Sequence, residues 1–322
     1  MDMVRDIGTA SRGFLPATRK ETALWLIEKL APDSAPNNLS LTFTVSGELD
    51  RAILHAALTV VFTRYDALRS VFVSTGPNIV RYVLSPQEMP VEIEDLSADA
   101  DRALVDFVTR AFAFDGRPML RAGLLSGPDG QTICLAFHHL IYDVISGAVL
   151  LADLAEAYNR LADGRDAGTR LREHVPVFVE PEPSAPSVEF WRRQLADFDP
   201  GALDLACGTP GSGPATLRAG KIDLELAPRT RAALQRLTRD LRAPEAVVML
   251  AAYAVLLAAH GVGPDMTIGS PVDVRPRHGP GVVGNHTNVL PRRIRVDGAA
   301  GFRSLVGQVR GTFFDAMKHA AV

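Results

Sequence analysis

A proline-rich stretch near the middle of the chain most strongly limits how it can fold. Residues 166–187 hold four prolines and show little hydrophobic periodicity, which is typical of a linker. The length of 322 residues also favours two domains, since a domain usually holds about 100–200 residues. The sequence therefore predicts four segments: a flexible N-terminus (1–14), a first lobe (15–165), the linker (166–187) and a second lobe (188–322).

The first lobe mixes strands and helices. Leu39–Val45 alternates apolar and polar side chains, which predicts a half-buried strand, and Asp50 is placed to cap the following helix. Leu120–Leu125 and Thr132–Phe137 have the pattern of a β-hairpin, and a long helix is expected from about Ile145 to Leu161. This order predicts an α/β fold built as two-layer α+β lobes, and it argues against a TIM barrel or an all-β sandwich.

The second lobe has the same mixed pattern. Pro244–Ala259 is apolar on all sides, so we expect that helix to be buried. The other elements expected here are helices at Val188–Ala196, Pro228–Leu241 and Phe302–Lys318, and strands at Ile222–Leu226, Met266–Ile268 and Val289–Val296.

Composition argues against several classes of function. The net charge of −3 gives no strong basic field, so nucleic acid is not expected as a partner. Cys134 and Cys207 cannot form a disulfide framework, and no cysteine or histidine cluster has zinc spacing, so no metal is expected. Met1–Arg12 lacks a signal-peptide core and no apolar run could span a bilayer, so we expect no membrane contact and a cytoplasmic location.

The most informative segment is Leu135–Asp143, with the sequence LAFHHLIYD, where a buried strand ends shortly before the long helix. Successive side chains of a strand point to opposite faces, so one of His138 and His139 can face the core while the other faces a cleft. Histidine suits a general base because it titrates near neutral pH. Neighbouring histidines more often serve packing, and the spacing alone leaves both roles open.

This segment resembles the HHxxxDG motif of the condensation domains of nonribosomal peptide synthetases, in the chloramphenicol-acetyltransferase-like superfamily. Further segments resemble that family's motifs in the same order: Pro16–Ile27, Arg64–Phe72, Phe114–Arg121, Phe190–Trp191 and Gly284–Arg292. The resemblance implies the superfamily's fold, in which two lobes form a V around a substrate tunnel.

The sequence departs from the family pattern at Val144, which replaces the glycine after Asp143. A valine would be strained there if the position needs a positive φ, and otherwise it changes only the shape of the tunnel. Glu21 stands where the family usually has glutamine. Lys318–Val322 resembles the start of the HQDxPFE motif, so the chain looks truncated and the second lobe is expected to be incomplete.

The resemblance also implies roles for individual residues. His139 would orient the acceptor and take its proton, and His138 would pack inward. Asp143 would be structural and pair with Arg69, with Arg275 as a second candidate.

Other residues of these motifs have a structural and a functional interpretation. Tyr142 is a core aromatic or a tunnel residue, Ser146 is a helix cap or lines the tunnel, and Asn288 forms a turn or contacts the pantetheine arm. The pairs Arg192–Arg193 and Arg292–Arg293 are expected to be solvated or to contact an acidic carrier protein.

The function implied by the resemblance is acyl transfer. Such a domain joins an acyl or peptidyl thioester to an amine or hydroxyl acceptor in nonribosomal peptide or hybrid polyketide biosynthesis. Carrier proteins deliver the substrates on phosphopantetheine arms, and the domain itself binds no cofactor. Three alternatives stay open: a free-standing acyltransferase that uses coenzyme A thioesters, a non-catalytic recruitment or gating module, and an epimerising relative. A cyclising variant is disfavoured because its motif begins with aspartate.

Overall fold

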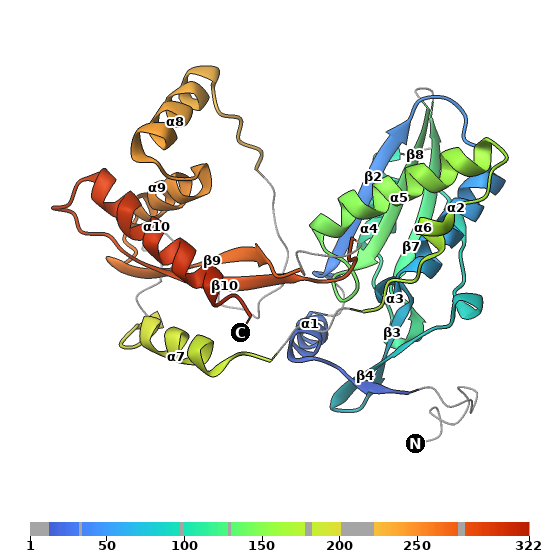
Figure 1. Ribbon diagram of the computed structural model, residues 1–322, viewed down its shortest axis with the longest axis horizontal. Helices are drawn as coiled ribbons and strands as arrows, with labels where there is room; N and C mark the ends of the chain where they lie inside the picture. The colour runs from blue at the N-terminus through green and yellow to red at the C-terminus, as the bar shows by residue number, and fades with distance from the viewer. Residues whose placement is uncertain are drawn as a thin grey trace. The chain divides into compact units, whose positions relative to one another are not determined.

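The computed structural model of the chain describes residues 13–31, 34–96, 100–127, 130–177, 182–200, 222–275 and 281–321. The described residues form two compact units (Figure 1). Unit 1 contains 13–177 and 281–285, and unit 2 contains 182–200, 222–275 and 286–321. Along the chain, the boundary between unit 1 and unit 2 falls inside residues 166–187, the stretch predicted as a linker. Residues 281–285 belong to unit 1 again, and nothing in the sequence predicts this.

The first sheet of unit 1 carries the histidine motif at one strand end. Its order is β2 (Asn38–Val45), β8 (Gly130–His138), β7 (Leu120–Gly127) and β5 (Ile93–Asp95). β7 and β8 pair antiparallel from Leu120 opposite Phe137 to Gly127 opposite Gly130, so the predicted hairpin is confirmed. A second sheet of unit 1 has the order β1 (Leu15–Pro16), β4 (Asn78–Val83), β3 (Ser70–Thr75) and β6 (Asp115–Pro118).

Helices pack on both faces of the first sheet. α2 (Arg51–Arg64) and α5 (Val144–Ala162) contact each other and share the main core of unit 1 with one set of alternate β8 side chains. α4 (Ala100–Thr109) contacts β2 and β8, and its Phe107 packs against the other set, which includes the buried Cys134. Cys207 lies outside the described residues.

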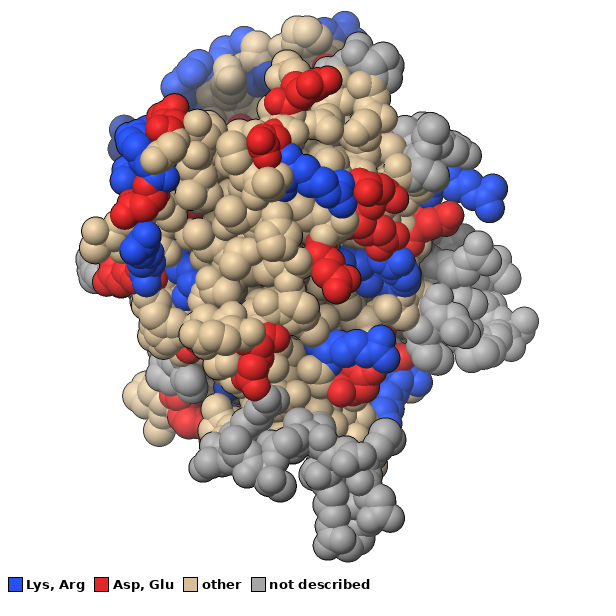
Figure 2. Space-filling model, turned by 90° about the vertical axis from the view of Figure 1, so that its right-hand side faces the viewer, with Lys and Arg blue, Asp and Glu red and all other residues tan. Residues whose placement is uncertain are grey.

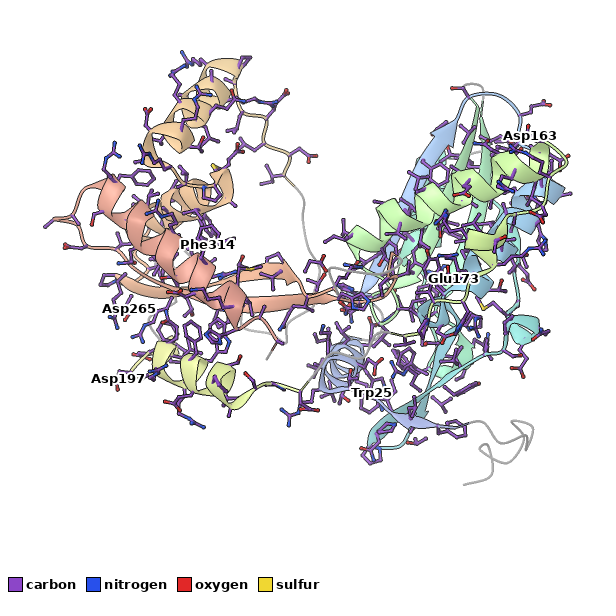
Figure 3. All side chains as sticks on the ribbon, in the orientation of Figure 1. Trp25, Asp163, Glu173, Asp197, Asp265 and Phe314 are labelled. Atoms are coloured by element: carbon purple, nitrogen blue, oxygen red, sulfur yellow. The ribbon has the colours of Figure 1, made fainter. Side chains whose placement is uncertain are left out.

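Shorter helices complete unit 1. α1 (Arg19–Leu30) begins with a capping box, in which the Thr18 hydroxyl accepts the Glu21 N–H and the Glu21 carboxylate accepts the Thr18 N–H. Trp25 of α1, labelled in Figure 3, is 2% exposed and anchors this helix in the core. The remaining helices of the unit are α3 (Asp66–Arg69), η1 (Pro86–Glu88) and α6 (Thr169–Arg172).

A buried network of polar side chains ties α2 to α5 and α6. The Tyr65 hydroxyl donates to Asp153 Oδ2 at 2.5 Å, and Arg64 Nε lies 3.4 Å from the same oxygen. Arg170 Nη2 donates to the other oxygen of Asp153 at 2.9 Å. Burial, and then the neighbouring Asp153, raise the pKa of Tyr65. The side chains of Arg64 and Asp153 are 1% and 3% exposed, so this network is part of the core.

Unit 2 contains a pair of long antiparallel strands, β9 (Asp265–Asp273) and β10 (Thr287–Arg295). Its helices are α7 (Ala185–Gln194), α8 (Pro228–Leu241), α9 (Glu245–Ala259) and α10 (Phe302–Lys318). α10 contacts α9 and β10, and apolar side chains of these elements form the core of this unit. The bounds of α8 and α10 are those expected from the sequence.

Two expectations for the elements of unit 2 are wrong. α9 is not buried on all sides, because Met249, Tyr253 and Leu256 on one side are 45%, 49% and 52% exposed. An apolar sequence says how much surface could be buried, but the neighbouring elements decide how much is covered. The second wrong expectation is the strand at Ile222–Leu226. Apolar and polar side chains alternate there, but the described residues 222–227 belong to no strand.

Arg292 and Arg293 are buried, at 0% and 8% exposed, so the expectation that they are solvated is wrong. Arg292 donates to the Phe313 carbonyl at 2.8 Å, and its guanidinium lies 4.5 Å from the Phe313 ring centroid. Burial lowers the pKa of Arg292. Arg293 forms an ion pair with Asp265 at 2.7 Å (Asp265 is labelled in Figure 3). Both arginines therefore hold β10 against its neighbours.

Basic and acidic side chains are interspersed on the face of the molecule in Figure 2. Exposed pairs of opposite charge occur in unit 1, such as Arg110 with Glu94 at 2.6 Å. Within the described residues, no single helix is long and apolar enough to cross a membrane, and α8 with α9 reach that length and composition only as a pair bent by 105°.

Candidate active site

Two hydrogen bonds to backbone carbonyls hold His139, the residue that follows β8 in the turn before α5. The His139 N–H donates to the Asn37 carbonyl at 2.8 Å, and ring Nδ1 lies 2.8 Å from the Tyr142 carbonyl oxygen. A carbonyl oxygen only accepts, so Nδ1 must carry the proton. The neutral ring of His139, which is partly exposed, therefore has Nε2 as its acceptor.

His138 is the buried member of the pair, at 1% exposed. Its Nδ1 accepts the Leu140 N–H at 3.1 Å, so its proton lies on Nε2, which is 3.2 Å from Glu28 Oε1. Phe114 packs edge-on against the ring with 5.6 Å between centroids. The two neighbouring histidines thus carry opposite tautomers, with Nε2–H in His138 and Nδ1–H in His139.

Glu28 and Asn37 belong to this site although the sequence does not point to them. Glu28 Oε1 accepts from the Asn37 side chain at 2.9 Å and from the Asn37 N–H at 3.3 Å, besides its contact with His138. In the sequence, Glu28 stands beside Lys29 near a helix end, as ordinary solvated charges do. Only the packing of α1 beside the end of β8 shows that its side chain is 11% exposed.

The charge of Glu28 gives a pH dependence that can be measured. Burial raises the pKa of its carboxyl, but the hydrogen bonds from His138 and Asn37 outweigh burial and leave this pKa below its ordinary value. Such a carboxyl stabilises the fold above the unfolded pKa of about 4.3, and this contribution is lost as the pH falls through the folded value.

We therefore expect Glu28→Gln to be less stable than the wild type at neutral pH, and the difference to shrink on acidification. Urea unfolding of both proteins across a pH series measures this difference in the free energy of unfolding. The contributions of the other titrating groups are the same in both proteins and cancel. A difference that stays constant with pH would show that the charge of Glu28 contributes nothing.

Asp143 caps the N-terminus of α5. Its Oδ1 accepts both the N–H and the hydroxyl of Ser146, each at 2.9 Å, and the residue is 1% exposed. Ser146 is the third residue of the helix. The expectation that Ser146 caps the helix is therefore wrong, and the cap is Asp143. The hydroxyl of Ser146 instead joins the cap to a distant segment of the chain.

The expected ion pair between Asp143 and Arg69 is wrong. The guanidinium of Arg69 binds Asp66 one turn earlier on α3 and donates to the carbonyl oxygens of Thr63 and Leu84. A carboxylate three residues away on the same helix is already beside the arginine, and it satisfies this buried charge at small entropic cost. The second candidate, Arg275, donates to Asp273 at 2.9 Å.

We expect Asp143→Ala to destabilise the fold by about 2 kcal/mol or more, because it removes a helix cap and takes the carboxylate acceptor from the buried Ser146 N–H. Asp50→Ala is the matched control, since Asp50 caps α2 through the N–H groups of Ala52 and Ile53 but is exposed. Its cost should be about 1 kcal/mol. Equal losses in thermal unfolding would show that burial of the α5 cap adds nothing.

Tyr142 and Val144 flank Asp143 in different environments. Tyr142 is 2% exposed and stacks on Phe137 with 4.2 Å between ring centroids. Burial, and then the Asp143 charge, raise the pKa of Tyr142 to about 12. Val144 starts α5 with a φ outside the left-handed region and is 79% exposed, so the valine is not strained. The position therefore does not require glycine for backbone reasons.

The segment 281–285 lies against the start of α5. The Gly284 N–H donates to Ser146 Oγ at 3.1 Å, and the same hydroxyl lies 3.0 Å from the Gly284 carbonyl oxygen. Ser146 thus joins this segment to the Asp143 cap. Asn288, the other predicted residue of this motif, lies in unit 2, where its side chain donates to the Ala320 carbonyl at 2.7 Å.

The chemistry that these residues offer is proton transfer. Nε2 of His139 can take a proton, while the carboxylates of Glu28 and Asp143 accept hydrogen bonds from neighbouring protein groups. Within the described ranges, no group of three or more His, Cys, Asp or Glu side chains could hold a metal ion.

Comparison with known proteins agrees with the motif pattern. A family model of the condensation domain matches residues 11–322. The probable non-canonical nonribosomal peptide synthetase CymA of Salinispora arenicola (strain CNS-205) is 30% identical over 321 residues, and the dimodular nonribosomal peptide synthase of Bacillus subtilis (strain 168) is 28% identical over 315 residues. These matches cover 95% and 92% of this chain but 4% and 13% of the relatives, so the chain spans a small part of such synthetases.

Solved structures share the fold at low sequence identity. The X-domain from teicoplanin biosynthesis has a TM-score of 0.79 at 22% identity, covering 98% of this chain and 73% of that chain. The first condensation domain of the calcium-dependent antibiotic synthetase, in complex with a substrate analogue, has a TM-score of 0.76 at 21% identity and coverages of 97% and 76%. The expected α/β fold of the superfamily is confirmed. The chain belongs to the condensation-domain family, whose members in nonribosomal peptide synthetases are amide-forming acyltransferases.

Proposed function

We propose that this chain is a condensation-type acyltransferase with His139 as its base. It joins a carrier-bound acyl or peptidyl thioester to an amine or hydroxyl acceptor. One observation carries the assignment: the Tyr142 carbonyl holds Nδ1–H of His139, which makes Nε2 the proton acceptor. General bases in such positions typically contribute about 10²–10⁴-fold to the rate.

In this mechanism, the nitrogen or oxygen of the acceptor attacks the thioester carbonyl while Nε2 of His139 takes the acceptor's proton. The new C–N or C–O bond forms, the C–S bond breaks, and the proton passes to the leaving pantetheine thiolate. Holding both reactants at the base supplies further acceleration, because it removes the entropic cost of bringing them together. His138, Asp143 and Ser146 maintain the shape of the turn around the base.

We further propose that carrier proteins deliver the substrates on phosphopantetheine in the cytoplasm, and that the domain holds no cofactor of its own. The similarity to nonribosomal peptide synthetases supports the proposal that the substrates are carrier-bound. Coenzyme A thioesters are the alternative donor, since the starter condensation domain of rhizomide synthetase, of similar fold, was solved in complex with C8-CoA.

A non-catalytic recruitment module is the second candidate. The teicoplanin X-domain, of the same fold, was solved in complex with OxyB, another protein. Val144 in place of the motif glycine favours this candidate, because an exposed bulky side chain stands one residue from Asp143. The intact His139 and its tautomer favour catalysis.

A single-turnover assay read by intact-protein mass spectrometry separates these candidates. The same acyl group is offered on a carrier protein and on coenzyme A, each with a panel of amines and alcohols. Transfer from the carrier supports the condensation proposal, and transfer from coenzyme A alone supports the free-standing enzyme. Binding of the carrier without transfer from either donor would overturn the catalytic proposal in favour of recruitment.

A further inference from the structure

We propose that Glu28 is a positioning residue for His139. It acts through His138 and Asn37 and touches neither substrate nor the reacting atoms. This inference rests on the proposed function, in which His139 is the base. It concerns a residue that lies in the last turn of α1.

Three donors converge on one oxygen of Glu28. Oε1 accepts from Asn37 Nδ2 at 2.9 Å, from His138 Nε2 at 3.2 Å and from the Asn37 N–H at 3.3 Å. The Glu28 side chain is 11% exposed and that of His138 is 1% exposed, so little water is present to replace these bonds. A buried acceptor with three protein donors is costly to remove, because each donor would lose its partner.

Glu28 thereby controls the backbone on both sides of His139. On one side, Glu28 fixes the Asn37 backbone and side chain, and the Asn37 carbonyl accepts the His139 N–H at 2.8 Å. On the other side, Glu28 accepts Nε2–H of His138, which leaves Nδ1 to accept the Leu140 N–H at 3.1 Å. Both peptide groups that flank the base are therefore tied to the same carboxylate.

The alternative tautomer of His138 shows why this carboxylate matters. With the proton on Nδ1, that N–H would face the Leu140 N–H, and the lone pair on Nε2 would face the Glu28 carboxylate. Both contacts would be repulsive in a buried site. Without Glu28, only the Leu140 N–H at Nδ1 selects the present tautomer in the described structure, and the Nε2–H of His138 loses the acceptor that holds the ring in place. The position of the His138 ring, the conformation of the turn and the orientation of the His139 ring would then vary.

The expected effect is on the rate of the chemical step, because misplacing a catalytic group by about 1 Å can cost about 10²-fold. We expect Glu28→Ala to lower kcat about 10- to 100-fold with KM for the acceptor unchanged. Glu28→Gln should restore most of kcat, because the amide oxygen can accept the same three bonds.

Glu21→Ala is the matched control. Glu21 lies on the same helix, its side chain is also 11% exposed, and it pairs with Arg81 at 2.7 Å without contacting His138. Glu21→Ala should lower the thermal stability as Glu28→Ala does but keep kcat within about twofold. A fall in kcat that follows the loss of stability equally in both variants would overturn the positioning role.

Nitrogen-15 NMR of the histidine rings gives a readout besides activity. The wild type should show Nε2–H in His138 and Nδ1–H in His139. In Glu28→Ala the Nε2–H signal of His138 should shift, because this N–H loses its acceptor, while Glu21→Ala should keep the wild-type signal. An unchanged His138 spectrum in Glu28→Ala overturns this inference even if the wild type is active. An inactive wild type with the expected tautomers would instead count against the proposed function alone.

Discussion

Replacing His139 with alanine is expected to slow single-turnover acyl transfer about 10²–10⁴-fold and to leave the fold intact. The ring is partly exposed and donates a single hydrogen bond, from Nδ1 to the Tyr142 carbonyl, so its removal disturbs little packing. What the variant loses is Nε2, the group that we propose accepts the proton. Transfer rates and thermal unfolding of the same preparation measure the two effects separately.

His55→Ala is the control for this experiment. His55 is an exposed histidine of the same unit whose Nε2 lies 2.9 Å from the Val91 carbonyl oxygen, so the control also removes one ring contact with the backbone. Its transfer rate should equal that of the wild type. A His139→Ala protein that is folded and transfers at the wild-type rate would exclude His139 as the base, and the proposed mechanism with it.

The largest loss of stability is expected from Asp153→Ala, at about 3–5 kcal/mol. Asp153 is the shared partner of Arg64, Tyr65 and Arg170, and removing it leaves the buried Arg64 guanidinium without its carboxylate. An uncompensated charge in the core costs more than the ion pair itself contributes, because the charge can no longer be solvated. Urea unfolding at neutral pH measures the difference.

Asp163→Ala provides the surface comparison, at the C-terminal end of the same helix. Asp163, labelled in Figure 3, pairs with Arg165, and their side chains are 61% and 56% exposed. Water replaces the lost contact there, so the expected cost is about 0.2–1 kcal/mol. Similar losses in the two variants would mean that the buried network contributes no more than a surface pair.

Much of the fold could be predicted from local patterns in the sequence. The bounds of α8 and α10, the hairpin of β7 and β8, and the Asp50 cap follow from periodicity and from the chemistry of single positions. The failures have a common cause. The alternation at 222–226 and the uniformly apolar α9 are local signals whose outcome depends on a neighbour to pair with or to cover them.

The sequence by itself determined the family, the order of its motifs and the position of the two histidines at a strand end. These depend on residue types at fixed spacing, which the chain carries wherever it folds. Only the tertiary structure decided that Arg69 binds Asp66, that Arg292 is fully buried and that Glu28 accepts His138 Nε2–H. The physical reason is that a charged side chain is solvated or buried according to what packs over it. The packing brings together residues as distant in the chain as Glu28 and His138, and no local pattern records it.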